Sequence, residues 1–227
     1  MDPLDAESEQ PGGDGAHQVC GACAAAVPGI DGVSITVMTD DANRTRVCAT
    51  SPLSERLDDL QFTLGEGPCL DVFTGGVPAI VPDLTSATSR QRWPVFSSAA
   101  VDAGVRALYT LPLRVGAIRL GVLAAHRTTA GLLDPEDLVR LLLFAERATL
   151  LLVVEDRTEF EKRPLRRAVV HQATGMVAVQ LGSSLEMALA RLRAHAFTAG
   201  LSMEQVADEV VARRLRFSPD NNNEPGL

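Results

Sequence analysis

The segment from Arg166 to Val211, RRAVVHQATGMVAVQLGSSLEMALARLRAHAFTAGLSMEQVADEVV, carries apolar residues at helical spacing in three separate runs. This spacing places the apolar side chains on one face of each helix, so the segment predicts three amphipathic helices. Gly182 and Gly200 separate the runs, and glycine suits the left-handed conformation that ends a helix. Three helices of roughly 12 to 16 residues enclose one small core. The expected apolar stripes are Val169, Ala173, Met176, Val177 and Gln180; then Leu185, Ala188, Leu189, Leu192 and Ala196; then Val206, Ala207, Val210 and Val211.

Two serines mark the starts of the second and third helices. Ser183 stands three residues before Glu186, and Ser202 stands three residues before Gln205. This is the capping-box spacing, in which the serine hydroxyl and the later side chain each satisfy a free backbone N–H group. We therefore expect a helix to begin directly after each serine.

The order of residues in this segment resembles the ANTAR family, whose three-helix domains bind RNA and act as transcription antiterminators. The resemblance covers about a quarter of the chain. His171 departs from it, standing where the family usually has an acidic residue, and Thr174 stands where the family often has a lysine. The resemblance implies binding to paired stem-loops in nascent RNA, which prevents a terminator from forming. It is carried by Gln172, Ala173, Gly175, Met176, Val177, Leu181, Gly182, Glu186, Ala188, Leu192, Arg193, Ala196, Leu201, Val206 and Ala207.

Charge is distributed unevenly along the 227 residues. The net charge is −8, yet the stretch from Lys162 to Phe217 holds nine basic and four acidic residues, a local balance of +5 that leaves −13 for the rest. A basic module on an acidic carrier suits contact with phosphate, although arginines on solvated helix faces give the same count. In RNA recognition, arginines position the phosphates and smaller polar groups read loop bases. The candidates are Arg166, Arg167, Arg191 and Arg193 for phosphate, and His171, Thr174, His195, Thr198 and Ser202 for bases.

Residues 17–154 show a different pattern, in which helical segments alternate with segments of period two. This order predicts an α+β domain with an antiparallel sheet flanked by helices. The expected helices are 17–27, 54–61, 93–104 and a long one from 135, and the expected strands are 32–39, 46–50, 77–81 at an edge, 107–114 and 118–127.

This part of the chain, about 17 to 155, resembles GAF domains, a small sensor fold. The resemblance implies a modest ligand pocket over the sheet. Its signal stays open between a small molecule, a redox change at Cys69 or at the pair Cys20 and Cys23, and no ligand; we expect no bound cofactor. The motifs are Gly32 to Ile35, Gly65 to Cys69, Leu111 to Leu113 and Gly121 to Leu123. The expected pocket residues are Gly65, Glu66, Cys69, Asp71, Trp93 and Phe96.

Together the two resemblances predict a disordered tail at 1–15, a GAF sensor domain at 16–155, a helical linker at 156–164, an ANTAR domain at 165–217 and a disordered tail at 218–227. The N-terminus is acidic and lacks the basic start and apolar core of a signal peptide. No run of eighteen apolar residues occurs. We therefore expect a cytoplasmic protein without a membrane partner.

The long helix is apolar around its whole circumference from Leu138 to Val154. One sheet cannot cover every face of such a helix, so another face meets a second helix, either 18–27 of the same chain or a copy from another subunit. We infer a homodimer through this helix.

The four cysteines and the histidines form no convincing catalytic or metal site. Cys20 and Cys23 are spaced as CxxC, and we favour two small buried thiols over a metal or redox pair. Some GAF proteins resemble a cysteine-dependent reductase of free methionine sulfoxide, in which Cys48 and Cys69 would be the thiols. We expect no enzyme, since a reductase has no need of the C-terminal module.

Duplex DNA is the main alternative to RNA. Ala196, Gly200 and Val206 have the spacing of a helix-turn-helix. The helix that would enter the major groove begins with Met203, Glu204 and Gln205, however, and a carboxylate facing phosphate opposes binding. This alternative also leaves the segment before Gly182 without a role.

Overall fold

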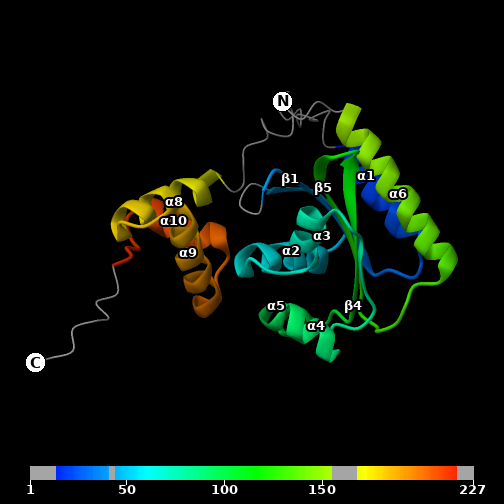
Figure 1. Cartoon of the computed structure of the whole chain (residues 1–227), viewed down its shortest axis with the longest axis horizontal. Coiled ribbons are helices and arrows are strands. Elements are labelled where there is room, and N and C mark those ends of the chain that lie inside the picture. The colour runs from blue at the N-terminus through cyan, green and yellow to red at the C-terminus, as the bar shows by residue number, and fades with distance from the viewer. Residues whose placement is uncertain (1–13, 41–43, 155–167, 219–227) are drawn as a thin grey trace, which may run out of the picture.

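The computed structural model of the chain describes residues 14–40, 44–154 and 168–218. The expected tails at 1–15 and 218–227 and the expected linker at 156–164 lie largely outside these ranges. The described elements form a sheet domain covered by helices and, beside it, a bundle of three helices (Figure 1). In chain order they are α1 (Asp14–Ala26), β1 (Gly32–Met38), β2 (Arg44–Ala49), α2 (Pro52–Leu64), α3 (Pro68–Gly75), β3 (Ala79–Val81), α4 (Ala87–Arg92), α5 (Pro94–Asp102), β4 (Ala107–Val115), β5 (Ile118–Arg127), α6 (Pro135–Val154), α8 (Ala168–Leu181), α9 (Leu185–Ala199) and α10 (Met203–Val211).

The sheet has five strands in the order β2-β1-β5-β4-β3, and every neighbouring pair is antiparallel. The predicted α+β fold is confirmed, including the edge position of β3. Helices α1 and α6 cover one face, and α2, α3 and α5 pack on the other (Figure 1). Side chains alternate between the two faces, so Ile35, Tyr109 and Leu123 meet α1 and α6, whereas Leu108 and Val122 meet the opposite helices.

Helix α6 begins as predicted, with Pro135 at its first position and the Asp134 Oδ1 atom accepting from Glu136 N at 2.9 Å. Helix α1 of the same chain covers one of its faces. A second face stays exposed, and no described helix is long and apolar enough to cross a membrane. We call this surface the outer face of α6; it consists of Val139, Leu142, Leu143, Leu150, Val153 and Val154.

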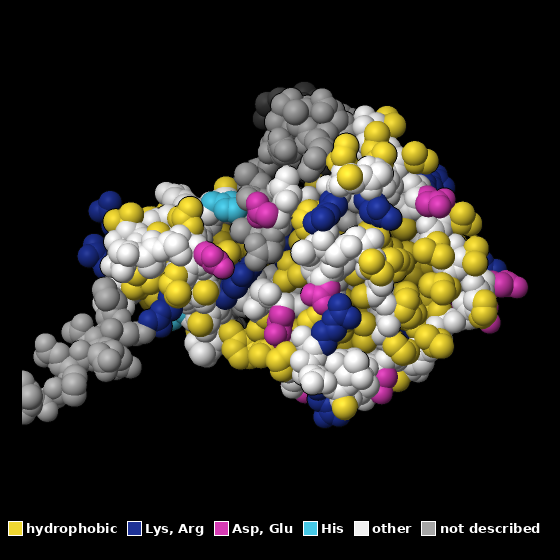
Figure 2. All heavy atoms as spheres, in the orientation of Figure 1, with side chains coloured by type: hydrophobic (Ala, Val, Ile, Leu, Met, Phe, Trp, Pro, Cys, Tyr) yellow, Lys and Arg dark blue, Asp and Glu magenta, His cyan; other side chains and the backbone are white. Residues whose placement is uncertain are grey.

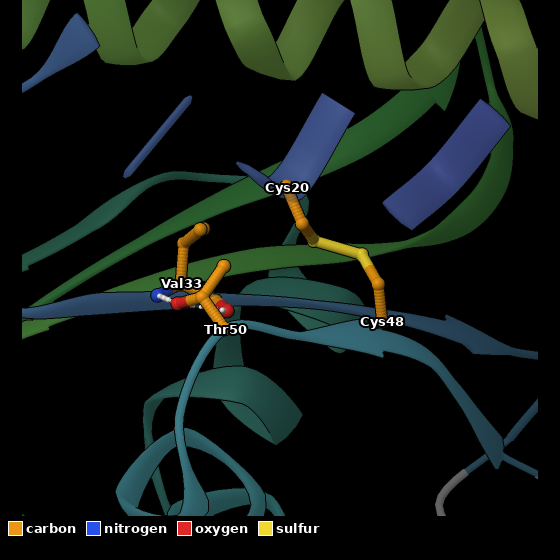
Figure 3. Close-up of a disulfide and its surroundings, with 4 residues drawn as sticks. All are labelled: Cys20, Val33, Cys48 and Thr50. Carbon is orange, nitrogen blue, oxygen red and sulfur yellow. Dashed lines mark hydrogen bonds between the residues drawn. A yellow bond between two sulfur atoms is a disulfide. The ribbon is translucent and has the colours of Figure 1, made fainter. Parts of the chain in front are cut away.

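The cysteines pair differently from the expectation. Cys20 on α1 forms a disulfide with Cys48 on β2 (Figure 3), whereas Cys20 and Cys23 were expected to be two free thiols. Cys23 is a free buried thiol, and burial raises its pKa to about 12. CxxC spacing places both cysteines on one helix face, but only the packing of α1 over β2 shows which partner that face meets. Beside the bond, Thr50 Oγ1 accepts from Val33 N at 2.9 Å.

We expect this disulfide to contribute measurably to stability. It joins residues 28 apart in sequence, and a loop of that size restricts the unfolded chain enough to contribute roughly 3 kcal/mol. A thiol reductant should therefore lower the free energy of unfolding of the oxidised protein in urea by that amount. The Cys48→Ala variant should not respond to the reductant, whereas Cys23→Ala should respond as the parent does. Equal stability of oxidised and reduced parent would contradict the expectation.

The three helices of the bundle form where the sequence pattern predicts them, and the start of one helix differs from the prediction. Gly182 and Gly200 adopt positive φ after α8 and α9, as expected, and Ser202 and Gln205 form the predicted capping box of α10. The start of α9 was predicted one residue too early: Ser184, not Ser183, is the N-cap and accepts from Met187 N at 3.2 Å. With two adjacent serines, the spacing alone could not choose between them.

The core of the bundle is shifted slightly from the predicted stripes. Val170 and Met203 are buried although neither was predicted, and Leu185 was predicted to be buried but is 63% exposed. Leu185 is the first residue of α9. The remaining buried residues are Ala173, Val177, Ala188, Leu189, Leu192, Ala196, Val206, Ala207 and Val210, joined by Phe62 of the sheet domain.

Candidate functional sites

The candidates for RNA contact fall on two helices and one cap of the bundle. His171 and Thr174 lie on α8, and Ser202 caps α10. Arg166 and Arg167 lie outside the described residues. The remaining candidates on α9 are Arg191, Arg193, His195 and Thr198.

The three hydroxyl candidates all have local backbone partners. Thr174 is buried and donates to Val170 O at 2.7 Å. Ser202 Oγ accepts from Gln205 N at 3.2 Å as the cap of α10. Thr198 is exposed and donates to Ala194 O at 2.9 Å. In this arrangement Thr198 offers a hydroxyl oxygen to a ligand, and Thr174 does not.

The two histidines are both half-buried. The ring of His195 packs edge-on against Phe217 with the ring centroids 5.6 Å apart, which holds the residues after α10 against α9. The Nε2 atom of His171 is buried and has no hydrogen-bond partner among the described residues. Neither histidine presents its ring freely to solvent.

Arg193 contacts the sheet domain. Its Nε donates to Phe62 O at 3.1 Å, near the end of α2, and its guanidinium lies 6.0 Å from the centroid of the Phe62 ring. The structure therefore places Arg193 where the three-helix bundle meets the sheet domain. Nothing in the spacing of α9 indicated this contact, because its partner lies 131 residues earlier.

Exposed arginines that sequence reasoning counted but did not single out follow α10. Arg213 and Arg216 are exposed, and Arg214 forms two hydrogen bonds with the Glu209 carboxylate at 2.8 and 2.9 Å. That contact lowers the pKa of Glu209. In Figure 2 arginine side chains line the outer edge of the bundle, away from the sheet domain. In the sequence, these arginines cluster directly after the apolar stripe of α10, and this cluster could have identified them as candidates.

Hydrogen bonds join four of the expected sensor pocket residues, Glu66 with Phe96 and Asp71 with Trp93, between the end of α2 and the start of α5, whereas Gly65 lies against Arg193 and Cys69 bonds to Gln61. Glu66 Oε1 accepts from Val95 N at 2.8 Å and from Phe96 N at 2.7 Å, which places a carboxylate at the N-terminus of α5. Asp71 Oδ2 accepts from Trp93 Nε1 at 3.2 Å. Trp93, Phe96 and Cys69 are buried. The polar ends of Glu66 and Asp71 thus already have partners within the chain.

Next to these residues lies a group that sequence reasoning missed, which we call the buried polar cluster: Thr36, Arg44, Asp58, Gln61, Cys69 and Thr110. Thr36 Oγ1 donates to Asp58 Oδ1 at 3.1 Å. Gln61 Oε1 accepts from Cys69 N at 2.8 Å, and Gln61 Nε2 donates to Cys69 Sγ at 3.1 Å. The signal was present in the strands, where polar residues alternate with apolar ones. Helices cover both faces of this sheet, so these polar positions are buried as well.

The chemistry of these residues does not support thiol catalysis. Cys48 is in the disulfide, and burial together with the nearby Asp58 carboxylate raises the pKa of the Cys69 thiol to about 12. Cys69 is therefore protonated at neutral pH and is a poor nucleophile. Among the described residues, no group of histidine, cysteine and carboxylate side chains could hold a metal ion.

The chain thus consists of an antiparallel sheet domain with a buried polar cluster on one face, followed by a three-helix bundle with exposed arginines. The chain belongs to the GAF domain family, whose profile matches residues 17–153, and the ANTAR domain profile matches residues 158–211. The two families are those that the sequence motifs indicated, in the same order. A GAF domain followed by an ANTAR domain is the composition of a signal-responsive regulator and not that of a typical enzyme.

The chain is similar to solved structures at low sequence identity. A domain of a protein described as a two-component sensor histidine kinase from Sinorhizobium meliloti 1021 is 16% identical, with a TM-score of 0.50, covering 72% of this chain and 99% of that one. The GAF domain region of a protein described as a membrane protein from Geobacter sulfurreducens PCA is 12% identical, with a TM-score of 0.49, covering 63% and 94%. No curated protein sequence matches the chain.

Proposed function

We propose that the chain binds paired stem-loops in nascent RNA through its ANTAR domain and thereby prevents transcription termination, under control of a signal at the GAF domain. The observation that carries this proposal is the ANTAR match at residues 158–211, on a bundle whose outer edge presents arginines. Arginine guanidinium groups pair well with phosphate oxygens, and RNA loops expose unstacked bases to smaller polar groups.

The active form is a homodimer that uses the outer face of α6. This face carries six large aliphatic side chains, each at least 42% exposed, on a helix whose opposite face is buried against α1 and the sheet. Val139, Leu143, Leu150 and Val153 repeat at the spacing of a coiled-coil seam, with Glu146 at the position between them. Two ANTAR domains in one dimer suit two stem-loops.

The GAF signal in this proposal is a small molecule bound beside the buried polar cluster, at Gly65, Glu66, Cys69, Asp71, Trp93 and Phe96. Glu66 and Asp71 face the start of α5 from the turn after α2 and from α3. A ligand that replaced the backbone partners of Glu66 would move α5 relative to α2. The protein would then have two conformations that differ in the position of α5, and a small molecule that binds one of them more tightly shifts the population toward it.

Duplex DNA remains the alternative because α9 and α10 are joined by a glycine turn in the manner of a helix-turn-helix. The first turn of α10 carries Glu204, and its cap hydroxyl is engaged with Gln205. A recognition helix with a carboxylate at its N-terminal end opposes the phosphates that it must approach. The charge of this helix therefore argues against its insertion into the major groove of DNA.

Binding of the full-length protein to a randomised stem-loop RNA pool and to duplex DNA, each with a salt titration, tests the proposal. We expect enrichment of stem-loops that weakens as salt rises, because phosphate contacts release counterions. Arg191→Ala should lower affinity roughly three- to tenfold and reduce the magnitude of the salt slope by about one, as loss of one phosphate contact does. Arg119→Ala, an exposed arginine on β5, should change neither. Preference for duplex DNA would refute the RNA assignment.

A further inference from the structure

The end of α2 in the GAF domain binds an arginine of the ANTAR domain. Helix α2 ends at Leu64, and Gly65 is its C-cap with φ 68°. The last carbonyls of a helix have no partner within it and carry partial negative charge, so a cation is stabilised there. Arg193 supplies that cation, with its Nε donating to Phe62 O at 3.1 Å.

Gly65 leaves the space that the guanidinium occupies. A Cβ atom at this position would stand 2.8 Å from Arg193 Nη1 and 3.1 Å from Cζ. Gly76 caps α3 with the same φ of 68°, yet a Cβ atom there would meet nothing within 4 Å. Of these two equivalent helix caps, only the one at Gly65 is filled by a side chain from the other domain.

The Phe62 side chain adds a hydrophobic part to the contact between α2 and the three-helix bundle. Its side chain is 1% exposed and belongs to the core of the three-helix bundle, together with Leu192 and Val206. On the GAF side, the Arg44 guanidinium lies 4.8 Å from the centroid of the Phe62 ring. An arginine of each domain therefore lies near the Phe62 ring, and the helices α2 and α9 are adjacent (Figure 1).

The same helix also carries the buried polar cluster. Asp58 and Gln61 belong to that cluster, and Phe62 follows Gln61 directly. Because a packed helix moves as a unit, a change in the partners of Asp58 or Gln61 shifts the end of α2 as well. Helix α2 thus connects the signal-facing side of the GAF domain to the ANTAR domain.

We infer that this α2–α9 contact, formed by Phe62, Gly65 and Arg193, is inhibitory: the GAF domain holds Arg193 away from RNA, and the signal releases it. The inference rests on the proposed RNA-binding function, because Arg193 is one of the residues that carry the ANTAR resemblance. RNA phosphate and the carbonyl end of α2 compete for the same guanidinium, since both present oxygen acceptors, with a full negative charge on phosphate and a partial one at the helix end. RNA binding and the α2–α9 contact therefore exclude each other.

The matched glycine variants Gly65→Asn and Gly76→Asn test this inference in the full-length protein. Asparagine tolerates positive φ better than other side chains, so both variants carry similar backbone strain and only the first displaces Arg193. Hydrogen exchange in the segment 57–65 reports the contact without RNA. A stem-loop pool enriched on the parent protein, or on Gly65→Asn if the parent enriches none, reports RNA affinity.

We expect Gly65→Asn to speed exchange in 57–65 and to bind the stem-loops at least roughly fivefold more tightly than the parent, the lower end of usual coupling between sites. Gly76→Asn should match the parent in both measurements. If the parent binds RNA and Gly65→Asn binds it with the same affinity, whether or not exchange is faster, the inhibitory role is overturned and the proposed function stands. Absence of RNA binding by the parent and by Gly65→Asn, despite faster exchange, would overturn both. Binding by Gly65→Asn alone would support both.

Discussion

Replacing Leu143 and Leu150 by aspartate is expected to convert the protein to a monomer and to weaken its binding to a two-stem-loop RNA by a factor of about 10² to 10⁴. The two residues lie on the outer face of α6, where they are 58% and 66% exposed in the single chain. Burying a carboxylate in an apolar helix interface without a partner is costly, so the dimer should not form. Linked binding to two stem-loops would then be lost, while each single stem-loop would still bind.

Sedimentation of the protein and titration with RNAs carrying one or two stem-loops provide the measurements. The control is Val77→Asp with Leu132→Asp, two apolar residues of 69% and 70% exposure that lie outside α6. This control should remain a dimer and bind both RNAs as the parent does. A Leu143→Asp/Leu150→Asp protein that still sediments as a dimer would place the interface elsewhere in the chain.

Asp58→Ala is expected to destabilise the GAF domain by roughly 3 to 5 kcal/mol, the usual cost of removing one partner from a buried ion pair. The Asp58 side chain is 3% exposed; it accepts from Thr36 Oγ1 at 3.1 Å and lies 3.5 Å from Arg46 Nη1. Its loss leaves a buried hydroxyl without its acceptor and removes a carboxylate from the surroundings of Arg46 and Arg44. A domain with ordinary stability of about 5 to 15 kcal/mol would lose a large part of it.

Urea unfolding followed by circular dichroism measures this effect. Glu55→Ala is the matched control, because Glu55 pairs with the same Arg46 at 3.6 Å but is 52% exposed. Exposed pairs contribute little, so this variant should lose less than about 1 kcal/mol. Equal losses of unfolding free energy in the two variants would show that burial does not determine how much Asp58 contributes to stability.

Much of the fold could be predicted from the sequence because local patterns determine it. Period-two segments gave the strands, and Gly200 and the pair Ser202 and Gln205 gave the ends of α9 and α10. The short helix α4 was not predicted, since six residues without an apolar stripe carry little periodic signal. The exposed position of Leu185 and the burial of Val170 depend on how far each helix overlaps its neighbours, which spacing does not encode.

The candidate sites depend on contacts between residues far apart in the chain, and there the sequence was less informative. The contact of Arg193 with a carbonyl of α2 was not predicted, and its expected contact with phosphate stays a prediction. Thr36 and Thr110 lie in the buried polar cluster because helices cover both faces of the sheet, which the alternation of polar and apolar residues does not reveal. Cys20 pairs with Cys48 because α1 crosses β2. Each of these outcomes required the packing of whole elements to be known.

The most direct test of the proposed function is transcription in vitro through a terminator preceded by two stem-loops enriched on the full-length protein. We predict that the parent protein, and more strongly Gly65→Asn, raises the fraction of transcripts that read through the terminator. The increase should vanish when either loop sequence is scrambled, since binding needs both loops. Tight RNA binding by Gly65→Asn without any rise in read-through would contradict antitermination.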